Sequence, residues 1–275
     1  MNSLKEKYQR LVSVIKDLGP SVIAFSGGVD STLVVKATLD SGIDYLAVTG
    51  VSPTTPRTDI EDVSKLVREL KLKHRFIRTD EHKKTEFIKN DGLRCYYCKD
   101  TLFSRLKEIA TSEGYKNVLE GSNLDDLRDY RPGRKACSDH GVKSPLCEAG
   151  ITKSQVRELL KMLGLWIWDK PSSPCLSSRI AYGVAITQEA LSMVEKAEEL
   201  MRRLGFRAFR VRHHGELARI EIAEEEMPRV FDPEVRRYIV DGLLDIGYKF
   251  VTLDLEGFIS GKMNRLLNER KGLAI

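Results

Sequence analysis

The chain has 275 residues, which allows one large domain or two smaller ones with a sizeable core. Hydrophobic residues make up 41% and charged residues 31%, the balance of an ordinary soluble protein rather than a fibrous, disordered or membrane protein. The net charge of +5 is mild: it suits a nucleotide or phosphorylated substrate without requiring a nucleic acid.

The N-terminal segment MNSLKEKYQRLVSVIKDLG predicts a charged amphipathic helix rather than a signal peptide. No apolar run approaches the length of a membrane span, so we expect a cytoplasmic protein without a membrane partner. In that compartment the five cysteines are expected to bind metal or take part in catalysis rather than to form disulfides.

The stretch SVIAFSGGVDST, residues 21–32, predicts a strand, a glycine turn and the start of a helix. Val22–Phe25 is a short apolar run, Ser26–Gly28 form the turn, and Asp30–Leu39 has helical spacing. Unpaired N–H groups and the helix dipole would converge where glycine leaves room for a phosphate. The turn lacks the lysine of the common phosphate loop and the spacing of a dinucleotide-binding loop.

Further strands are predicted at Ile43–Val48, Lys73–Arg78 and Asn117–Glu120, with a helix at Ile60–Leu70. This alternation predicts an α/β fold with a doubly wound parallel sheet. Ligands of such sheets lie beyond the carboxyl ends of the strands, so the segments 26–31, 49–52 and 121–126 should surround one crevice. Asp125, Asp126 and Asp129 there are either a solvated loop or ligands of magnesium or substrate.

The segment Arg128–Gly150 is rich in turn residues and predicts a long functional loop, followed by a helix that Thr152 caps and that ends at Leu163. We place a domain boundary at 184/185. The smaller C-terminal domain, 185–275, should be α+β, with helices and strands at the following ranges: 188–204 (helix), 207–213 (strand), 217–222 (strand), 233–244 (helix) and 249–255 (strand).

Cys95 and Cys98 form a C-x-x-C just before a helix predicted at Thr101–Ala110, and Cys175 lies far along the chain. The pair could be half of a zinc site completed by Cys137, His140 or Cys147, a redox dithiol, part of an iron–sulfur cluster, or two packed cysteines. Three thiols suit a [4Fe-4S] cluster that leaves one iron without a protein ligand.

Several stretches together resemble known families. SGGVDS resembles the pyrophosphate-binding loop of the PP-loop ATP pyrophosphatases, which cleave ATP between the α and β phosphates. With GSNLDDLRDYRPG, SPLCEAGITKSQVR, WDKPSSPCLSSRIAYG and RVRHHGELARIEI, nearly the whole chain is similar to the LarE-type sulfur insertases. That family is described as adenylating the carboxylates of pyridinium-3,5-biscarboxylate mononucleotide and converting them to thiocarboxylates for the nickel-pincer nucleotide cofactor.

The resemblance implies ATP, Mg²⁺ and, because Cys95 and Cys98 are present, a [4Fe-4S] cluster held with Cys175. It also implies a nucleotide substrate and an external sulfide or other sulfur donor. Cys175 is expected as a cluster ligand or as the sulfur source, and Ser178 and Arg179 beside it should orient the reacting carboxylate. The residues expected to bind or activate ATP are Ala24, Ser26, Gly27, Gly28, Asp30, Ser31, Thr49 and Gly121.

Arg210 and Arg212 alternate along a predicted strand, the geometry of a two-pronged anion clamp for the substrate. The alternative is a solvated strand face paired with Glu221 or Glu216. His213 and His214 are expected at the surface rather than as ligands.

Three other functions remain open: a cluster-dependent tRNA thiolase, an amidotransferase-type synthetase, and a nucleotide-binding regulator without catalysis. The acidic segments AEEEMP and EKAEEL and the lack of an RNA-binding motif make a nucleic-acid partner unlikely. The exposed strand edges expected in the C-terminal domain predict a homo-oligomer.

Overall fold

The computed structural model describes residues 2–128, 132–171, 173–259 and 261–265, and the chain forms two compact units. The first comprises the chain up to Glu81 and Cys95–Ser173; the second comprises His82–Arg94 and the chain from Pro174. This division differs from the predicted boundary at 184/185 in two ways. It falls earlier, and it assigns an inserted segment to the second unit, because long-range packing rather than sequence order defines a compact unit.

The first unit contains a four-stranded parallel sheet in the order β3-β2-β1-β4. Each predicted strand is present within a few residues, and the α/β, doubly wound fold is confirmed. The strands are β1 (Ser21–Ala24), β2 (Tyr45–Val51), β3 (His74–Arg78) and β4 (Asn117–Leu119). The helices are α1 (Asn2–Leu18), α2 (Val29–Ser41), α3 (Arg57–Leu70), α5 (Arg94–Glu113), α6 (Pro132–Asp139), α7 (Pro145–Glu148) and α8 (Lys153–Met162).

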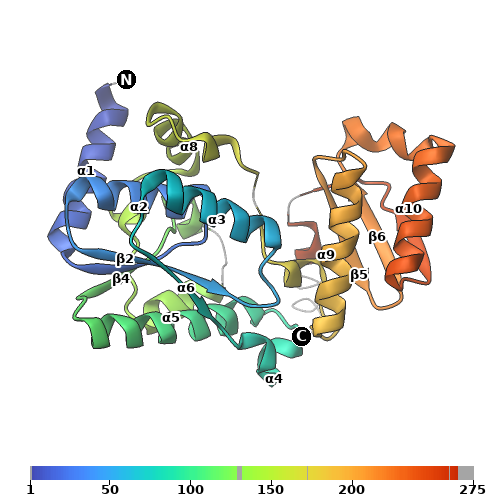
Figure 1. Cartoon of the computed structure of the whole chain (residues 1–275), viewed down its shortest axis with the longest axis horizontal. Helices are drawn as coiled ribbons and strands as arrows, with labels where there is room; N and C mark the ends of the chain where they lie inside the picture. Colours follow the sequence, from blue (N-terminus) through green and yellow to red (C-terminus); the bar gives the residue numbers. More distant parts are fainter. Residues whose placement is uncertain (1, 129–131, 172, 260, 266–275) are drawn as a thin grey trace, which may run out of the picture. The chain divides into compact units, whose positions relative to one another are not determined.

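Successive strand residues bury opposite faces of this sheet. Ile23 packs in one hydrophobic cluster with side chains of α1, α2, α3 and α8, whereas its neighbour Val22 packs in another with Phe103 and Leu106 of α5. Figure 1 shows α2 and α3 on one side of the sheet and α5 on the other. The sheet is therefore covered on both faces, and the carboxyl ends of its strands are left to build a site.

Two predictions about the intervening segments were wrong. Helix α5 begins at Arg94 rather than Thr101, so the C-x-x-C lies in its first turns and not before it. The segment predicted as a long loop contains α6 and α7, because Ala136, Cys137 and Leu146 supply apolar side chains that the core buries. Thr152 caps α8 with a capping box, as predicted.

The second unit contains a three-stranded mixed sheet in the order β5-β6-β7. Helices α9 and α10 contribute Ala197, Met201, Ile239 and Leu243 to its core. The predicted C-terminal elements are present, and the α+β class of this region is confirmed. They are α9 (Gln188–Arg203), β5 (Phe209–His214), β6 (Leu217–Ile222), α10 (Pro233–Ile246) and β7 (Phe250–Leu253), and the inserted segment adds α4 (Thr85–Ile88).

None of the helices in the described residues combines the length and the apolar character that crossing a bilayer requires.

Candidate functional site

The glycine turn between β1 and α2 has the geometry of an anion site. Gly27 has φ +69°, and a Cβ there would lie 2.6 Å from Val63 Cγ2. Gly28 is the N-cap of α2 and supplies no side chain to the first N–H groups of the helix. These donors are the groups that a phosphate satisfies at a helix N-terminus.

Two serine hydroxyls stabilise this turn through hydrogen bonds within it. Ser31 Oγ donates to the Gly28 carbonyl at 3.1 Å and lies 3.1 Å from Ser26 Oγ. The Gly28 N–H in turn donates to Ser26 Oγ at 3.4 Å. The turn is therefore shaped before any ligand binds, which reduces the entropy cost of binding.

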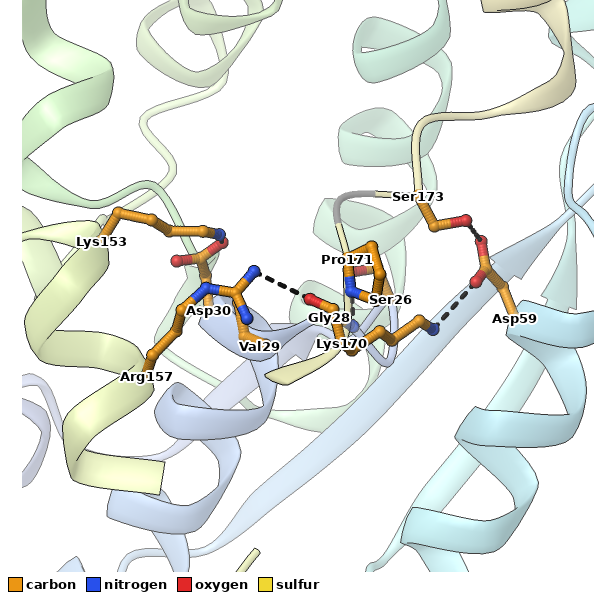
Figure 2. A pocket seen from close by; sticks show the side chains of 10 residues that line it. All are labelled: Ser26, Gly28, Val29, Asp30, Asp59, Lys153, Arg157, Lys170, Pro171 and Ser173. Atoms are coloured by element: carbon orange, nitrogen blue, oxygen red, sulfur yellow. Dashed lines mark hydrogen bonds and ion pairs between the residues drawn. The ribbon is translucent and has the colours of Figure 1, made fainter. Parts of the chain in front are cut away.

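A cavity of about 200 Å³ opens beside the turn. Figure 2 shows Lys153 and Arg157 on one side of Ser26 and Gly28, with Lys170 and Asp59 on the other. The volume is below the range of about 300–1,000 Å³ that is typical of sites for a whole ligand. It therefore suits the phosphate end of a nucleotide. Its lining residues are Ser26, Gly28, Val29, Asp30, Asp59, Lys153, Arg157, Lys170, Pro171 and Ser173.

Three cationic side chains line this cavity, and carboxylates or carbonyls hold each of them. Lys153 Nζ donates to Asp30 Oδ2, and the two side chains are 39% and 23% exposed. Lys170 Nζ lies 2.9 Å from Asp59 Oδ1 and 2.7 Å from Asp62 Oδ2. Burial opposes the charge of Lys170, but hydrogen bonds and attraction from Asp62 and Asp59 outweigh it and hold its pKa above the ordinary value.

Arg157 forms hydrogen bonds with the backbone of the segment that contains Lys170, a lining residue of the cavity. Its two Nη atoms donate to the carbonyls of Trp168 and Lys170, at 2.7 and 2.8 Å. Lys153 and Arg157 are one helical turn apart at the start of α8. Cations at a helix N-terminus oppose the helix dipole, so their placement favours a role in binding an anion over a role in helix stability.

The end of β4 approaches the start of α2 closely. A Cβ on Gly121 would lie 2.9 Å from the Ser31 nitrogen, so only glycine fits without a shift. Beyond it, Asn123 Nδ2 donates to Asp30 Oδ1 at 3.2 Å. The predicted residues Ser26–Ser31 and Gly121 are thus brought together around Asp30.

Ala24 ends β1 and Thr49 lies within β2 of the same sheet, but neither lines this cavity. The Thr49 hydroxyl donates to the Phe25 carbonyl at 2.6 Å and lies 2.8 Å from His74 Nε2. Because the hydroxyl hydrogen is used, the neutral His74 ring donates from Nε2 to Thr49. Burial lowers the pKa of His74 to about 4, so the ring is neutral at physiological pH.

The carboxylates of Asp125 and Asp126 organise the chain after β4. Asp125 Oδ2 accepts from the Lys153 N–H at 2.8 Å and so caps α8. Asp126 Oδ2 accepts from the Asn123 N–H at 3.0 Å. Neither lines the cavity, and Asp129 lies outside the described residues.

All five cysteines lie in the described part of the chain, and none forms a disulfide. Cys95 is exposed and Cys98 half-buried, three residues apart on α5. Burial, with the nearby Glu120 carboxylate, raises the pKa of the Cys137 and Cys147 thiols to about 11, so both are protonated at neutral pH. Over the described ranges, no three His, Cys, Asp or Glu side chains stand close enough together to hold a metal ion.

Cys175 belongs to the second unit, in a loop that a buried ion pair fixes. Its Sγ lies 2.9 Å from Ser177 Oγ. Arg179, 3% exposed, forms two hydrogen bonds with Glu198 of α9, at 2.9 and 3.0 Å. It also donates to the carbonyls of Pro174 and Cys175 and to Ser178 Oγ. The predicted residues Cys175, Ser178 and Arg179 therefore form one connected group.

Arg212 of β5 is buried and paired with Glu221 of β6, at 2.9 and 2.7 Å. It also donates to the Ser178 carbonyl at 3.2 Å. The pairing with Glu221 was foreseen as the alternative to an anion clamp, but that alternative placed Arg212 on a solvated face, whereas its side chain is buried. His213, expected at the surface, is 6% exposed, because β5 pairs with β6 at this position and the His213 ring packs 5.6 Å from that of Tyr248.

Arg210 lies on the same strand, half-buried and stacked 4.8 Å from the Phe258 ring. Burial, together with the positive charges of Arg179 and Arg212, lowers the pKa of Arg210 to about 10. An anion beside the Arg210 guanidinium would favour its charged form and so oppose the effects of burial and of the neighbouring cations.

The chain is 39% identical over 273 residues to the pyridinium-3,5-bisthiocarboxylic acid mononucleotide synthase of Lactiplantibacillus plantarum. The alignment covers 98% of each protein. The chain belongs to the LarE family.

Two further relatives of this LarE-family chain are uncharacterized proteins. One from Synechocystis sp. is 42% identical over 97% of this chain and the whole of that protein, and one from Methanocaldococcus jannaschii is 30% identical over 93% and 94%. No family model matches the chain. Among solved structures, the NMN synthetase from Francisella tularensis has a TM-score of 0.49 and 23% identity, over 62% of this chain and 75% of that one.

Sequence reasoning missed several residues that line the cavity of this LarE-family chain: Asp59, Lys153, Arg157, Lys170, Pro171 and Ser173. One signal was available for two of them, because Lys153 and Arg157 are basic residues in the first turns of a capped helix. For Asp59 and Lys170 no such signal exists, because their meeting depends on tertiary packing.

Proposed function

We propose that this protein uses ATP to convert the carboxylates of pyridinium-3,5-biscarboxylate mononucleotide into thiocarboxylates. The observation that supports it most directly is the 39% identity, over 98% of both chains, to a synthase named for the bisthiocarboxylic acid product. The tRNA thiolase, amidotransferase and regulator alternatives have no comparable support.

Activation must come first because a carboxylate is a poor electrophile: its negative charge repels a sulfur nucleophile. In the proposed first step a substrate carboxylate oxygen attacks the α-phosphorus of ATP, and the bond to the β-phosphate breaks. The products are an acyl adenylate and pyrophosphate. The sulfur nucleophile then attacks the acyl carbon, and AMP leaves with the oxygen.

The cavity beside the glycine turn supports this first step. The N–H groups at the start of α2 would bind the departing phosphates, and Lys153 and Arg157 would offset the negative charge that develops on them. Mg²⁺ commonly uses one or two carboxylates together with substrate phosphates, and Asp30 is a carboxylate of that kind at the cavity wall. Lys153 would then exchange its contact with Asp30 for a phosphate.

The source of sulfur is the second part of the proposal. Cys95, Cys98 and Cys175 would hold a [4Fe-4S] cluster, which when bound would supply the sulfur atom that is transferred. The C-x-x-C thiols lie one turn apart on α5, but no three metal-ligating side chains of the described residues stand together, so the donor set as the structure shows it does not yet hold the cluster.

The second unit would bind the substrate. Arg210 and Arg212 would contact its phosphate, and Arg210 is the better placed of the two because burial and neighbouring cations disfavour its charge. Ser178 and Arg179 would orient the reacting carboxylate next to Cys175. The same unit is also our candidate for self-association, since Phe250 on β7 is 59% exposed.

The test is anaerobic turnover with ATP, sulfide and the biscarboxylate substrate. We expect pyrophosphate release that depends on the substrate, and a product in which sulfur replaces oxygen, detected by mass spectrometry. Asp30→Asn should abolish pyrophosphate release. Release without sulfur incorporation, or sulfur incorporation into tRNA instead, would contradict the proposal.

A further inference from the structure

Lys170 is a cation of the cavity beside the glycine turn, on the side opposite Lys153 (Figure 2). Its side chain is 15% exposed, against 39% for that of Lys153. Two carboxylates hold it rather than one, since Nζ lies 2.9 Å from Asp59 Oδ1 and 2.7 Å from Asp62 Oδ2. Lys170 is therefore held more firmly in place than Lys153.

The backbone of Lys170 is fixed as well as its side chain. Arg157 Nη2 donates to the Lys170 carbonyl at 2.8 Å, so α8 holds the residue from one side. Asp59, in the first turn of α3, accepts from the Lys170 ammonium and also from Ser173 Oγ, at 2.9 and 3.1 Å. Hydrogen bonds thus connect α8 to α3 through Lys170. A donor fixed in this way needs no reorganisation when a ligand binds.

These contacts do not use the whole hydrogen-bonding capacity of Lys170. An ammonium group has three N–H donors, and its acceptors among the described residues are the carboxylates of Asp59 and Asp62. One N–H is therefore left for a ligand in the cavity. Burial opposes the charge, but the two carboxylates outweigh it and keep the pKa of Lys170 above its ordinary value, so the donor is cationic at neutral pH.

The charges around the cavity indicate the kind of ligand that can use this donor. Three cations line the cavity, and three carboxylates line it or pair with these cations, so the protein groups nearly cancel. They are Lys153, Arg157 and Lys170, and Asp30, Asp59 and Asp62. A bare polyphosphate would be repelled by the carboxylates, whereas one that carries Mg²⁺ brings a cation to offset them. The site therefore fits a magnesium-bound diphosphate group.

We propose that Lys170 is a third cationic ligand of the β- and γ-phosphates of ATP and of the pyrophosphate that they become, and that Asp59 is its positioning residue. Lys153 can leave Asp30 to contact the phosphates, whereas Lys170 stays in place and donates its remaining N–H to a phosphate oxygen. Asp59 acts through Lys170, by holding the ammonium at the cavity wall. This inference rests on the proposed function, since it requires cleavage of ATP between the α- and β-phosphates.

The experiment measures the binding of magnesium pyrophosphate, MgATP and AMP to Lys170→Met and to wild type by calorimetry. AMP lacks the two phosphates that Lys170 contacts, so it reports on the integrity of the rest of the site. Losing a hydrogen bond to a charged group costs about 10- to 100-fold in affinity. We expect a loss of that size for pyrophosphate and MgATP, and none for AMP. The matched control, Lys36→Met on α2, removes a lysine that pairs with Asp40 away from the cavity, and it should bind all three ligands as wild type does.

Asp59→Asn tests the positioning role. If Asp59 acts through Lys170, its substitution has no further effect once Lys170 is replaced. The double variant should then bind pyrophosphate as weakly as Lys170→Met alone. Losses that add up in the double variant overturn the positioning role of Asp59.

Two results overturn the role of Lys170 and leave the proposed function intact: unchanged pyrophosphate binding in Lys170→Met, or an equal loss for AMP. Thermal unfolding shows whether the variant is folded; if it is not, Lys170→Gln, which keeps a hydrogen-bonding group without the charge, is judged by the same two results. A wild type that neither binds magnesium pyrophosphate nor releases it from ATP overturns the proposed function and the inference together.

Discussion

A charged pair at the cavity of the first unit and two charged pairs in the second unit differ in their exposure to solvent. In the first, Lys153 and Asp30 are 39% and 23% exposed at the wall of a cavity. In the second, Arg179 and Glu198 are 3% and 5% exposed, and Arg212 and Glu221 are 7% and 0% exposed. An exposed pair contributes little to stability and can exchange its partner for a ligand, whereas a buried pair is costly to break. The exposed pair of the first unit is thus compatible with the proposed phosphate site, and the buried pairs of the second unit hold the Cys175 loop in place.

Breaking the buried pair should give the largest effect. Glu198→Gln leaves the Arg179 charge buried without its partner, and we expect a loss of about 3–5 kcal/mol in the free energy of unfolding of the second unit. Chemical denaturation, monitored by hydrogen exchange of the α9 amides, measures this loss of stability. The control is Glu199→Gln, in an exposed pair with Arg203, which should cost no more than about 0.5 kcal/mol. Equal losses would show that burial does not distinguish the two pairs.

Removing a cation from the cavity should affect catalysis and leave stability almost unchanged. We expect Lys153→Met to lower substrate-dependent pyrophosphate release about 100-fold, the cost of losing one group that stabilises developing charge. Steady-state release measures it, with the melting temperature as a check on folding. Lys107→Met, at an exposed position of α5, should behave as wild type. A Lys153→Met enzyme with full activity would remove this side chain from the phosphate site.

A methyl group at the glycine turn should cost less in stability than the buried-pair change. Gly27→Ala combines a left-handed backbone with a contact to Val63, and we expect about 2 kcal/mol of destabilisation together with weaker ATP binding. Gly42→Ala has a similar φ but open space around the new Cβ, so it isolates the backbone strain. If both variants lose the same free energy, the Val63 contact is irrelevant.

A lower pH should destabilise the first unit through protonation of His74, and this is the smallest of the four expected effects. Burial lowers the pKa of His74 from 6.5 to about 4, so the unfolded chain binds more protons between these values. Stability should therefore fall by about 1–2 kcal/mol as the pH drops from 7 to 5. The pH dependence of urea denaturation measures it. His74→Asn should flatten this dependence, and an unchanged slope in the variant would assign it to other groups.

Local patterns predicted the strand, the turn and the helix that form the candidate phosphate site. The apolar run, the glycines and the helical spacing around Ser26–Ser31 are all contained in a short segment, so the turn and its open helix N-terminus could be read directly. The same holds for α8, where Thr152 caps the helix. The start of α5 at Arg94 was missed because Asn90, Asp91 and Gly92 just before it are equally typical of a turn.

Contacts between segments far apart in the chain could not be predicted from the sequence. Lys170 meets Asp59 more than a hundred residues away, and the burial of Arg212 depends on which strand follows β5 in the sheet. Either arginine of the RVR pattern could be solvated or buried until the strand pairing is known. The sequence therefore offered candidate residues but not the residues that they contact.

The inserted segment His82–Arg94 has a practical consequence for dissecting the protein. The chain passes from one unit to the other after Glu81, after Arg94 and after Ser173. A fragment ending near residue 173 would carry Asn90 and Arg94 without the Ala181 and Ser177 carbonyls to which they donate. A fragment starting there would lack the Asn90 and Ile88 carbonyls that accept from the Gly183 and Ile186 N–H groups. Neither truncation yields an intact half: the first unit alone would need residues 82–94 replaced by a short linker, and the second unit alone would need residues 82–94 joined to the chain from Pro174.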